Sequence, residues 1–134
     1  MKDLLKRVDQ AIEREDLRWK RHNRTIEVEL WRSGHWQRVH LDRVSDRYVL
    51  WSTIAGASYV TKSAKRWRNL AYRAWRKNAL KELVTFSFDK RDQLIGVIEQ
   101  PIATLDDEEL VFYIRTLAQH CDRFEYILTG EDEE

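Results

Sequence analysis

Apolar residues recur along the last part of the chain at alternating intervals of four and three positions. The series consists of Leu110, Ile114, Leu117, Cys121, Phe124 and Leu128. This spacing places all of them along one side of an α-helix. The apolar side is widened by Val111, Ala118 and Ile127. A helix with so broad an apolar face needs a large surface to pack against, most simply a β-sheet.

The residues at the two ends of this segment predict where the helix begins and ends. Thr104 occupies a position suited to an N-cap, with Asp107 three residues later, as in a capping box. Acidic residues fill positions 106–109, in the first turn, where the helix dipole favours negative charge. Gly130 follows at a position where a glycine would end the helix.

Helical spacing also appears twice before this segment. Leu5, Val8, Ile12 and Trp19 fall at helical spacing and predict an amphipathic first helix from Lys2 to about Leu17. A second helix is predicted over residues 62–80, with Thr61 or Ser63 as its cap. Residues 20–24, which follow the first helix, are interpreted as a basic joint.

Alternation of apolar and polar residues predicts strands in the remaining segments. In the first of them, Ile26, Val28 and Leu30 alternate with polar residues. The five predicted strands cover residues 25–30, 36–42, 48–55, 83–88 and 93–98. The third strand is more apolar than the two before it, so we expect it near the centre of the sheet.

In chain order the predicted elements are α-β-β-β-α-β-β-α. Successive strands joined by short turns favour antiparallel pairing, so the predicted fold class is α+β, with helices packed on a five-stranded antiparallel sheet. The length of 134 residues, without repeats or linkers, predicts one domain over residues 1–134 that ends in an acidic tail at 131–134.

Charge is divided unevenly along the chain, although the net charge is only +1. Residues 62–81 contain eight basic residues and no acidic one. Residues 104–134 contain ten acidic residues against two basic ones, Arg115 and Arg123. This division favours an electrostatic match within the molecule or between subunits over a uniformly basic, nucleic-acid-coated protein.

The single cysteine, Cys121, excludes a disulfide within the chain and is interpreted as a small buried hydrophobic residue, because it belongs to the apolar stripe. The first residues lack the continuous apolar region of a secretory signal. No segment approaches the roughly 18 consecutive apolar residues that a membrane span requires. We therefore expect a cytoplasmic protein.

The predicted element order and the closing helix resemble the secretion-chaperone-like fold of type III secretion chaperones and YbjN-like proteins. The likeness lies in Leu-x-x-Glu-Glu-Leu at residues 105–110 and in Leu-Ala-x-x-x-Asp-x-x-Glu at residues 117–125. It implies a small, often dimeric protein without catalytic residues that binds extended segments of partner proteins. The basic second helix departs from the acidic character common among type III chaperones.

Catalytic, metal-binding and cofactor-binding patterns are not evident in the sequence. The acidic residues 106–109 are explained by the helix dipole. The four histidines lack the spacing of metal ligands, and the four glycines are too far apart for a phosphate-binding loop. We therefore expect no enzyme activity, no metal and no cofactor.

Tryptophans provide the first candidate binding surface. Trp31, Trp36 and Trp51 fall opposite the apolar positions of the predicted strands, with Arg38 between them. If helices cover only the other face, this aromatic face would bind a peptide, a second copy or nucleobases. The alternative is that a helix covers these side chains.

The second predicted helix provides another candidate surface. Its small and aromatic residues form a possible partner or dimer seam that consists of Ala64, Trp67, Ala71, Ala74 and Trp75. Its basic residues form a possible anion-binding set that consists of Arg66, Arg68, Arg73, Arg76 and Lys77. The alternative is an ordinary solvated face on a packed helix.

Together these observations predict a cytoplasmic, non-catalytic, chaperone-like module that binds a protein or peptide client and acts as a homodimer. The competing hypothesis is a nucleic-acid-binding module that uses the basic, tryptophan-containing helix at residues 62–81. The near-zero net charge argues against the second hypothesis.

Overall fold

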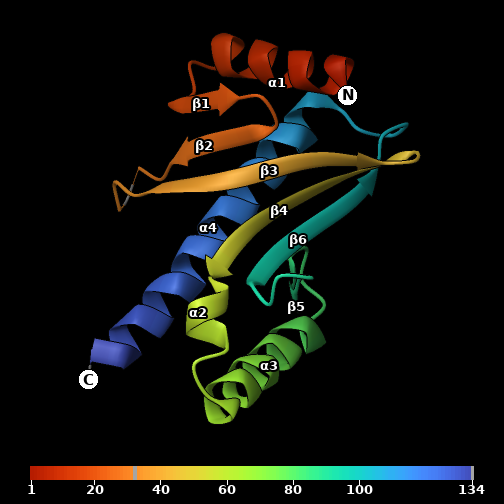
Figure 1. Cartoon of the computed structure of the whole chain (residues 1–134). Coiled ribbons are helices and arrows are strands. Elements are labelled where there is room, and N and C mark those ends of the chain that lie inside the picture. The colour runs from red at the N-terminus through yellow and green to blue at the C-terminus, as the bar shows by residue number, and fades with distance from the viewer. Residues whose placement is uncertain (32, 134) are drawn as a thin grey trace.

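The computed structural model describes residues 1–31 and 33–133, with side chains placed as far as Gly130. Within these residues, six strands form one antiparallel sheet in the order β1-β2-β3-β4-β6-β5. Helix α1 lies at the β1 end, α3 lies at the β5 end, and α4 crosses one face of the sheet (Figure 1). The elements are α1 (Lys2–Arg14), β1 (Trp19–His22), β2 (Thr25–Glu29), β3 (Trp36–Val44), β4 (Arg47–Ala55), α2 (Ala57–Val60), α3 (Ala64–Ala79), β5 (Thr85–Phe88), β6 (Leu94–Pro101) and α4 (Asp107–Glu133).

The α+β class, the five predicted strands and the three predicted helices are confirmed. The prediction of a basic joint at residues 20–24 is wrong, because Trp19–His22 forms a sixth strand that pairs with β2. Trp19, which the helical spacing grouped with the first helix, is instead the buried residue of this four-residue strand. So short a strand with one buried residue shows almost no alternation of apolar and polar positions. The strand is defined by a hairpin turn, in which Asn23 adopts a positive φ of 56°. The short helix α2 was also not predicted.

Strand β4 lies inside the sheet, between β3 and β6, as its apolar composition predicted. Its side chains alternate strictly between the two faces of the sheet. Tyr48, Leu50, Ser52 and Ile54 are buried, whereas Val49, Trp51 and Thr53 are half-buried. The buried set faces the core, and the half-buried set faces the opposite side.

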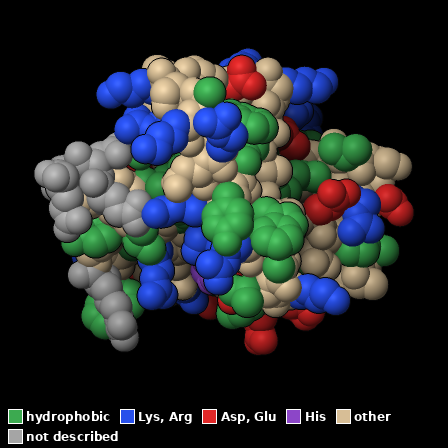
Figure 2. All heavy atoms as spheres, turned by 90° about the horizontal axis from the view of Figure 1, so that it is seen from below, with side chains coloured by type: hydrophobic (Ala, Val, Ile, Leu, Met, Phe, Trp, Pro, Cys, Tyr) green, Lys and Arg blue, Asp and Glu red, His purple; other side chains and the backbone are tan. Residues whose placement is uncertain are grey.

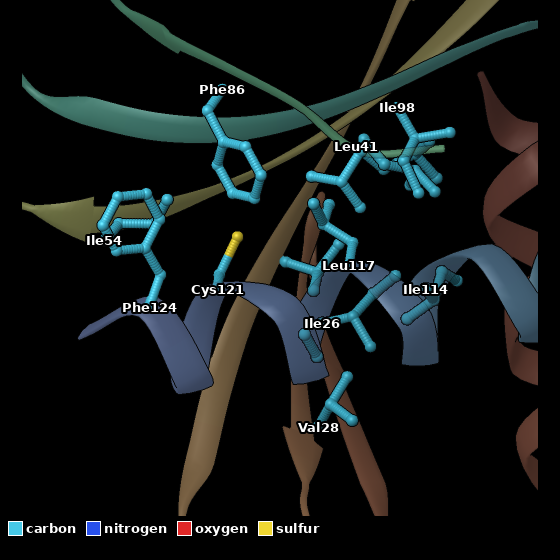
Figure 3. Close-up of a cluster of buried hydrophobic side chains, with 14 of the residues drawn as sticks. Ile26, Val28, Leu41, Ile54, Phe86, Ile98, Ile114, Leu117, Cys121 and Phe124 are labelled. Atoms are coloured by element: carbon cyan, nitrogen blue, oxygen red, sulfur yellow. The ribbon is translucent and has the colours of Figure 1, made fainter. Parts of the chain in front are cut away.

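Helix α4 closes the core against β3, β4 and β6. All six residues of the predicted stripe, from Leu110 to Leu128, are buried. Figure 3 shows Leu117, Cys121 and Phe124 directed from α4 towards the side chains of the sheet. Ile127 does not widen the buried face as predicted, because 38% of its surface is exposed beyond the edge of the sheet.

Both predicted ends of the closing helix differ from the structure. The N-cap is Asp106 rather than Thr104, because the Asp106 carboxylate accepts a hydrogen bond of 2.7 Å from the backbone N–H of Glu109. Leu105, which is buried, fixes this entry to the helix. Gly130 does not end the helix, which continues to Glu133.

Gly96 allows α4 to approach the sheet closely. A Cβ atom at this position would lie 2.5 Å from Sγ of Cys121 and 3.2 Å from Cγ1 of Val84. Such distances are shorter than van der Waals contact, so only a residue without a side chain fits beneath the helix. Burial raises the pKa of the Cys121 thiol to about 12, which agrees with its predicted role as an apolar packing residue.

We predict that Gly96→Ala destabilises the fold by about 1–3 kcal/mol, because the added methyl group overpacks the contact with α4. Urea unfolding followed by circular dichroism measures the change. Cys121→Ala in the same chain should restore part of the loss, since it removes the sulfur atom. The control is Gly130→Ala, where nothing lies within 4 Å. An equal loss in the control would contradict the prediction.

Candidate protein-binding surface

Helix α3 is attached to the edge of the sheet by a narrow contact. Ser63 caps the helix, with its hydroxyl accepting a 3.0 Å hydrogen bond from the backbone N–H of Arg66. Leu70 and Ala74 are its buried residues, and the helix packs on the edge strand β5. Ala74 is therefore part of the core of this chain, which corrects its predicted place in a partner seam.

Asn78 fixes α3 to β5 through its side-chain amide. Its Nδ2 donates to the backbone carbonyl of Phe86 at 2.7 Å, and its Oδ1 accepts from the backbone N–H of Phe86 at 2.8 Å. The amide thus satisfies two backbone groups of the edge strand that would otherwise pair with a further strand. This clamp sets the position of the helix although few of its residues are buried.

One side of α3 carries the remaining residues of the predicted seam. We call this side the seam flank; it consists of Ala64, Trp67, Ala71 and Trp75, at intervals of three, four and four residues. Trp67 is 45% exposed and Trp75 is 66% exposed. The Trp67 ring stacks on Phe88 of the edge strand, with ring centroids 5.8 Å apart.

The other side of α3 faces α4 across a groove. Two adjoining hollows, of about 470 and 390 Å³, share Lys77, Phe124 and Ile127, and we call them together the α3–α4 groove. From α3 and the following residues the groove is lined by Asn69, Tyr72, Arg73, Arg76 and Leu80. From α4 it is also lined by Gln119, His120 and Arg123.

The floor of the groove is aromatic, and a cation lies above it. Phe124 packs edge-on against Phe86, with ring centroids 5.4 Å apart. The Lys77 ammonium lies 4.8 Å from the centroid of the Phe124 ring and 5.8 Å from that of Phe86. Such cation–π contacts hold the charge over the apolar floor.

The walls of the groove are mainly basic. Arg73, Arg76, Lys77 and Arg123 line it, and Glu82 is the one acidic residue among its described lining residues. Figure 2, seen from the side of α3, shows blue Lys and Arg side chains around green hydrophobic groups, with the red acidic groups towards the margins.

The structure divides the predicted anion-binding set. Arg73, Arg76 and Lys77 come together in the groove. Arg66 instead lies over the Tyr59 ring, 4.1 Å from its centroid, and Arg68 lines neither hollow. The sequence pattern does not reveal the contribution of α4 to the groove, because helical spacing assigns Ile127 to the buried face and Arg123 has no local signal of proximity to α3.

Two of the three tryptophans lie where the sequence predicted, because Trp36 and Trp51 share the less buried face of the sheet with Arg38, whereas Trp31 does not. Trp31 lies in the turn after β2, outside the sheet, and lines a hollow together with Gln119 and Arg123 of α4. Trp36 begins β3 and is 45% exposed, with the Lys20 ammonium 5.3 Å from its ring centroid.

Trp51 lies on the less buried side of the sheet and is held by its neighbours. Its ring stacks on His40 with centroids 4.1 Å apart, and its Nε1 donates to Asp42 at 2.9 Å. Burial lowers the pKa of His40, so the stacked ring favours its neutral form. Arg38 is exposed on the same side, with its Nε 3.6 Å from Glu27.

The described residues contain no group of three or more His, Cys, Asp or Glu side chains arranged to hold a metal ion. Among the described helices, none combines the length and apolar character needed to cross a bilayer.

This arrangement of an antiparallel sheet with α4 across one face is similar in fold to solved type III secretion chaperones. It is similar to the type III secretion chaperone SycH of Yersinia pestis, solved with a fragment of YscM2, with a TM-score of 0.56 and 14% identity over 89% of this chain and 97% of that one. It is also similar to the HopA1–SchA chaperone–effector complex, with a TM-score of 0.57 and 10% identity. That match covers 88% of this chain and 89% of the chain in the complex.

The E. coli protein YbjN, which is proposed to be a transcription regulator, is similar over 96% of this chain and 93% of its own, with a TM-score of 0.66 and 10% identity. No protein-family model matches the sequence, and no curated protein matches it. At these identities the likeness establishes the fold, as the sequence motifs predicted. It does not establish the function, which has to be inferred from the surface residues of this chain.

We predict that Asn78→Ala loosens α3 from the sheet and costs about 1–3 kcal/mol, because it leaves both backbone groups of Phe86 without their partner. Hydrogen exchange of the α3 and β5 amides should accelerate more than that of α4. Asn69→Ala, an exposed position on the same helix, is the control. Unchanged exchange in the Asn78 variant would disprove the clamp.

Proposed function

We propose that this chain is a cytoplasmic, single-domain, non-catalytic module that binds a segment of a partner protein in the manner of a chaperone and acts as a homodimer. The observation that carries the proposal is the surface of α3, which presents large exposed aromatic residues and a groove with an apolar floor. Exposed apolar patches of this kind on a folded protein are typical of protein-binding sites.

Two structural neighbours support a protein partner. SycH was solved bound to a fragment of YscM2, and SchA was solved in a chaperone–effector complex. In both structures this fold is found in a complex with another protein. The same scaffold in this chain, combined with an open groove on α3, favours the same kind of task.

The homodimer is proposed to form through the seam flank. Small residues such as Ala64 and Ala71 permit close approach of a second backbone, and the neighbouring Trp67 and Trp75 offer the large aromatic anchors that dominate interface energies. A two-fold axis would bring the same flank of both subunits together. The groove on the other side of α3 then stays accessible to a client.

Nucleic-acid binding by α3 is the competing hypothesis, and the proposed regulatory role of YbjN is its best support. It would require a basic surface that follows a phosphate backbone. Here the net charge is only +1, without the basic character expected of such a module, and two of the three aromatic residues of α3, Trp67 and Trp75, lie on the seam flank. These features favour a compact protein partner.

A capture experiment distinguishes the two hypotheses. The full chain, immobilised in a lysate of its source organism, is expected to retain a defined protein after nuclease treatment. Retention that disappears with nuclease would favour the nucleic-acid hypothesis. Mass spectrometry of the retained material identifies the partner.

We predict that Ala71→Arg disrupts the dimer while each subunit stays folded, because a long charged side chain would separate the two seam flanks. Light scattering should give twice the chain mass of 16.2 kDa for the wild type and the single mass for the variant. Asn69→Arg, which adds the same side chain on the groove side, is the matched control and should remain dimeric. A monomeric wild type at tens of micromolar would disprove the dimer.

A further inference from the structure

We propose that the α3–α4 groove binds an acidic segment of a partner protein, one in which apolar side chains alternate with carboxylates. This inference rests on the proposed protein-binding function and specifies the chemistry of the client. It follows from two features of the groove, its apolar floor and its basic walls.

The floor selects an apolar anchor. Phe124 is almost fully buried, whereas Ile127 at its side is 38% exposed and Leu80 at the end of the groove is 68% exposed. A leucine or phenylalanine side chain placed between them would remove apolar surface from water on both partners. Anchors that fill such pockets contribute most of the energy of protein interfaces.

The walls select carboxylates beside that anchor. The Arg73, Arg76 and Lys77 side chains approach the floor from α3, and Arg123 approaches it from α4. A client with Asp or Glu next to its apolar residue would place negative charge among these cations. Charge-assisted bonds of this kind are strongest where solvent is partly excluded, as it would be once the anchor covers the floor.

The same features disfavour a nucleic acid in this groove. Single-stranded nucleic acids bind by stacking bases on exposed aromatic faces. Tyr72 is the one exposed Phe, Tyr or Trp among the described lining residues, and the Arg76 guanidinium lies 5.9 Å from its ring centroid. Phe124 lies beneath Lys77. Trp67 and Trp75, which offer aromatic faces, line neither hollow. Aliphatic contact combined with carboxylate pairing therefore fits a peptide better.

Fluorescence anisotropy with a labelled synthetic peptide tests the proposal on the full chain. The probe alternates leucine and phenylalanine with glutamate and aspartate; a second peptide has lysine in place of each acid. The acidic peptide should bind and the basic one should not. Arg76→Glu should weaken binding at least about tenfold, because it replaces attraction with repulsion at the groove wall.

Two matched controls restrict the explanation to the groove. Arg68→Glu makes the same change of charge on the same helix but outside the groove, and should alter affinity less than about threefold. Ile127→Ser should weaken binding, whereas Phe112→Ser, at a residue of α4 that is 56% exposed and lines neither hollow, should not. Circular dichroism verifies that each variant is folded.

Several outcomes would overturn the inference. Equal losses of peptide affinity in Arg68→Glu and Arg76→Glu would mean that the peptide is attracted to the overall charge of the helix. Displacement of the peptide by a single-stranded oligonucleotide of the same charge would mean that the groove binds phosphate groups. Binding that appears only after residues 131–134 are neutralised to Gln and Asn would assign the groove to the acidic tail of this chain. If the acidic peptide does not bind although the chain is dimeric and captures a protein, the proposed function holds and the groove does not bind an acidic segment.

Discussion

The close approach of α4 to β6 at Gly96 and Cys121 is the constraint on which the rest of the structure depends. The helix carries most of the apolar stripe that closes the core, so its distance from the sheet sets how well that stripe packs. A side chain at position 96 would push the helix outward and open space around Leu117 and Phe124. Because Phe124 is also the floor of the α3–α4 groove, the same contact defines the depth of the proposed binding site.

Helix α3 serves a different purpose from α4. It buries only Leu70 and Ala74 and relies on the Asn78 clamp for its orientation, so both of its flanks remain available to other molecules. A helix held by so small a contact contributes modestly to the core but displays a large surface at a fixed angle. The separation of a seam flank from a basic groove explains how one helix would serve both a second copy and a client.

The fold is shared with chaperones that are only 10–14% identical in sequence. A fold persists at such low identity because many combinations of apolar residues fit the same pattern of burial. Surface chemistry is not constrained in this way. The basic groove of this chain therefore has to be interpreted from its own residues, and the likeness supplies the scaffold on which it is built.

The sequence by itself determined the features that depend on local periodicity. The stripe from Leu110 to Leu128, the alternation along β4 and the burial of Cys121 all follow from spacings that a single helix or strand imposes. Tertiary structure decided whatever depends on a partner distant in the sequence. Residues 19–22 form a strand because they pair with β2. Ala74 is buried in the core and so cannot belong to the seam flank. Arg76 and Ile127 line one groove because α3 and α4 lie close together there. Such juxtapositions carry no local pattern, because the residues that create them are many positions apart.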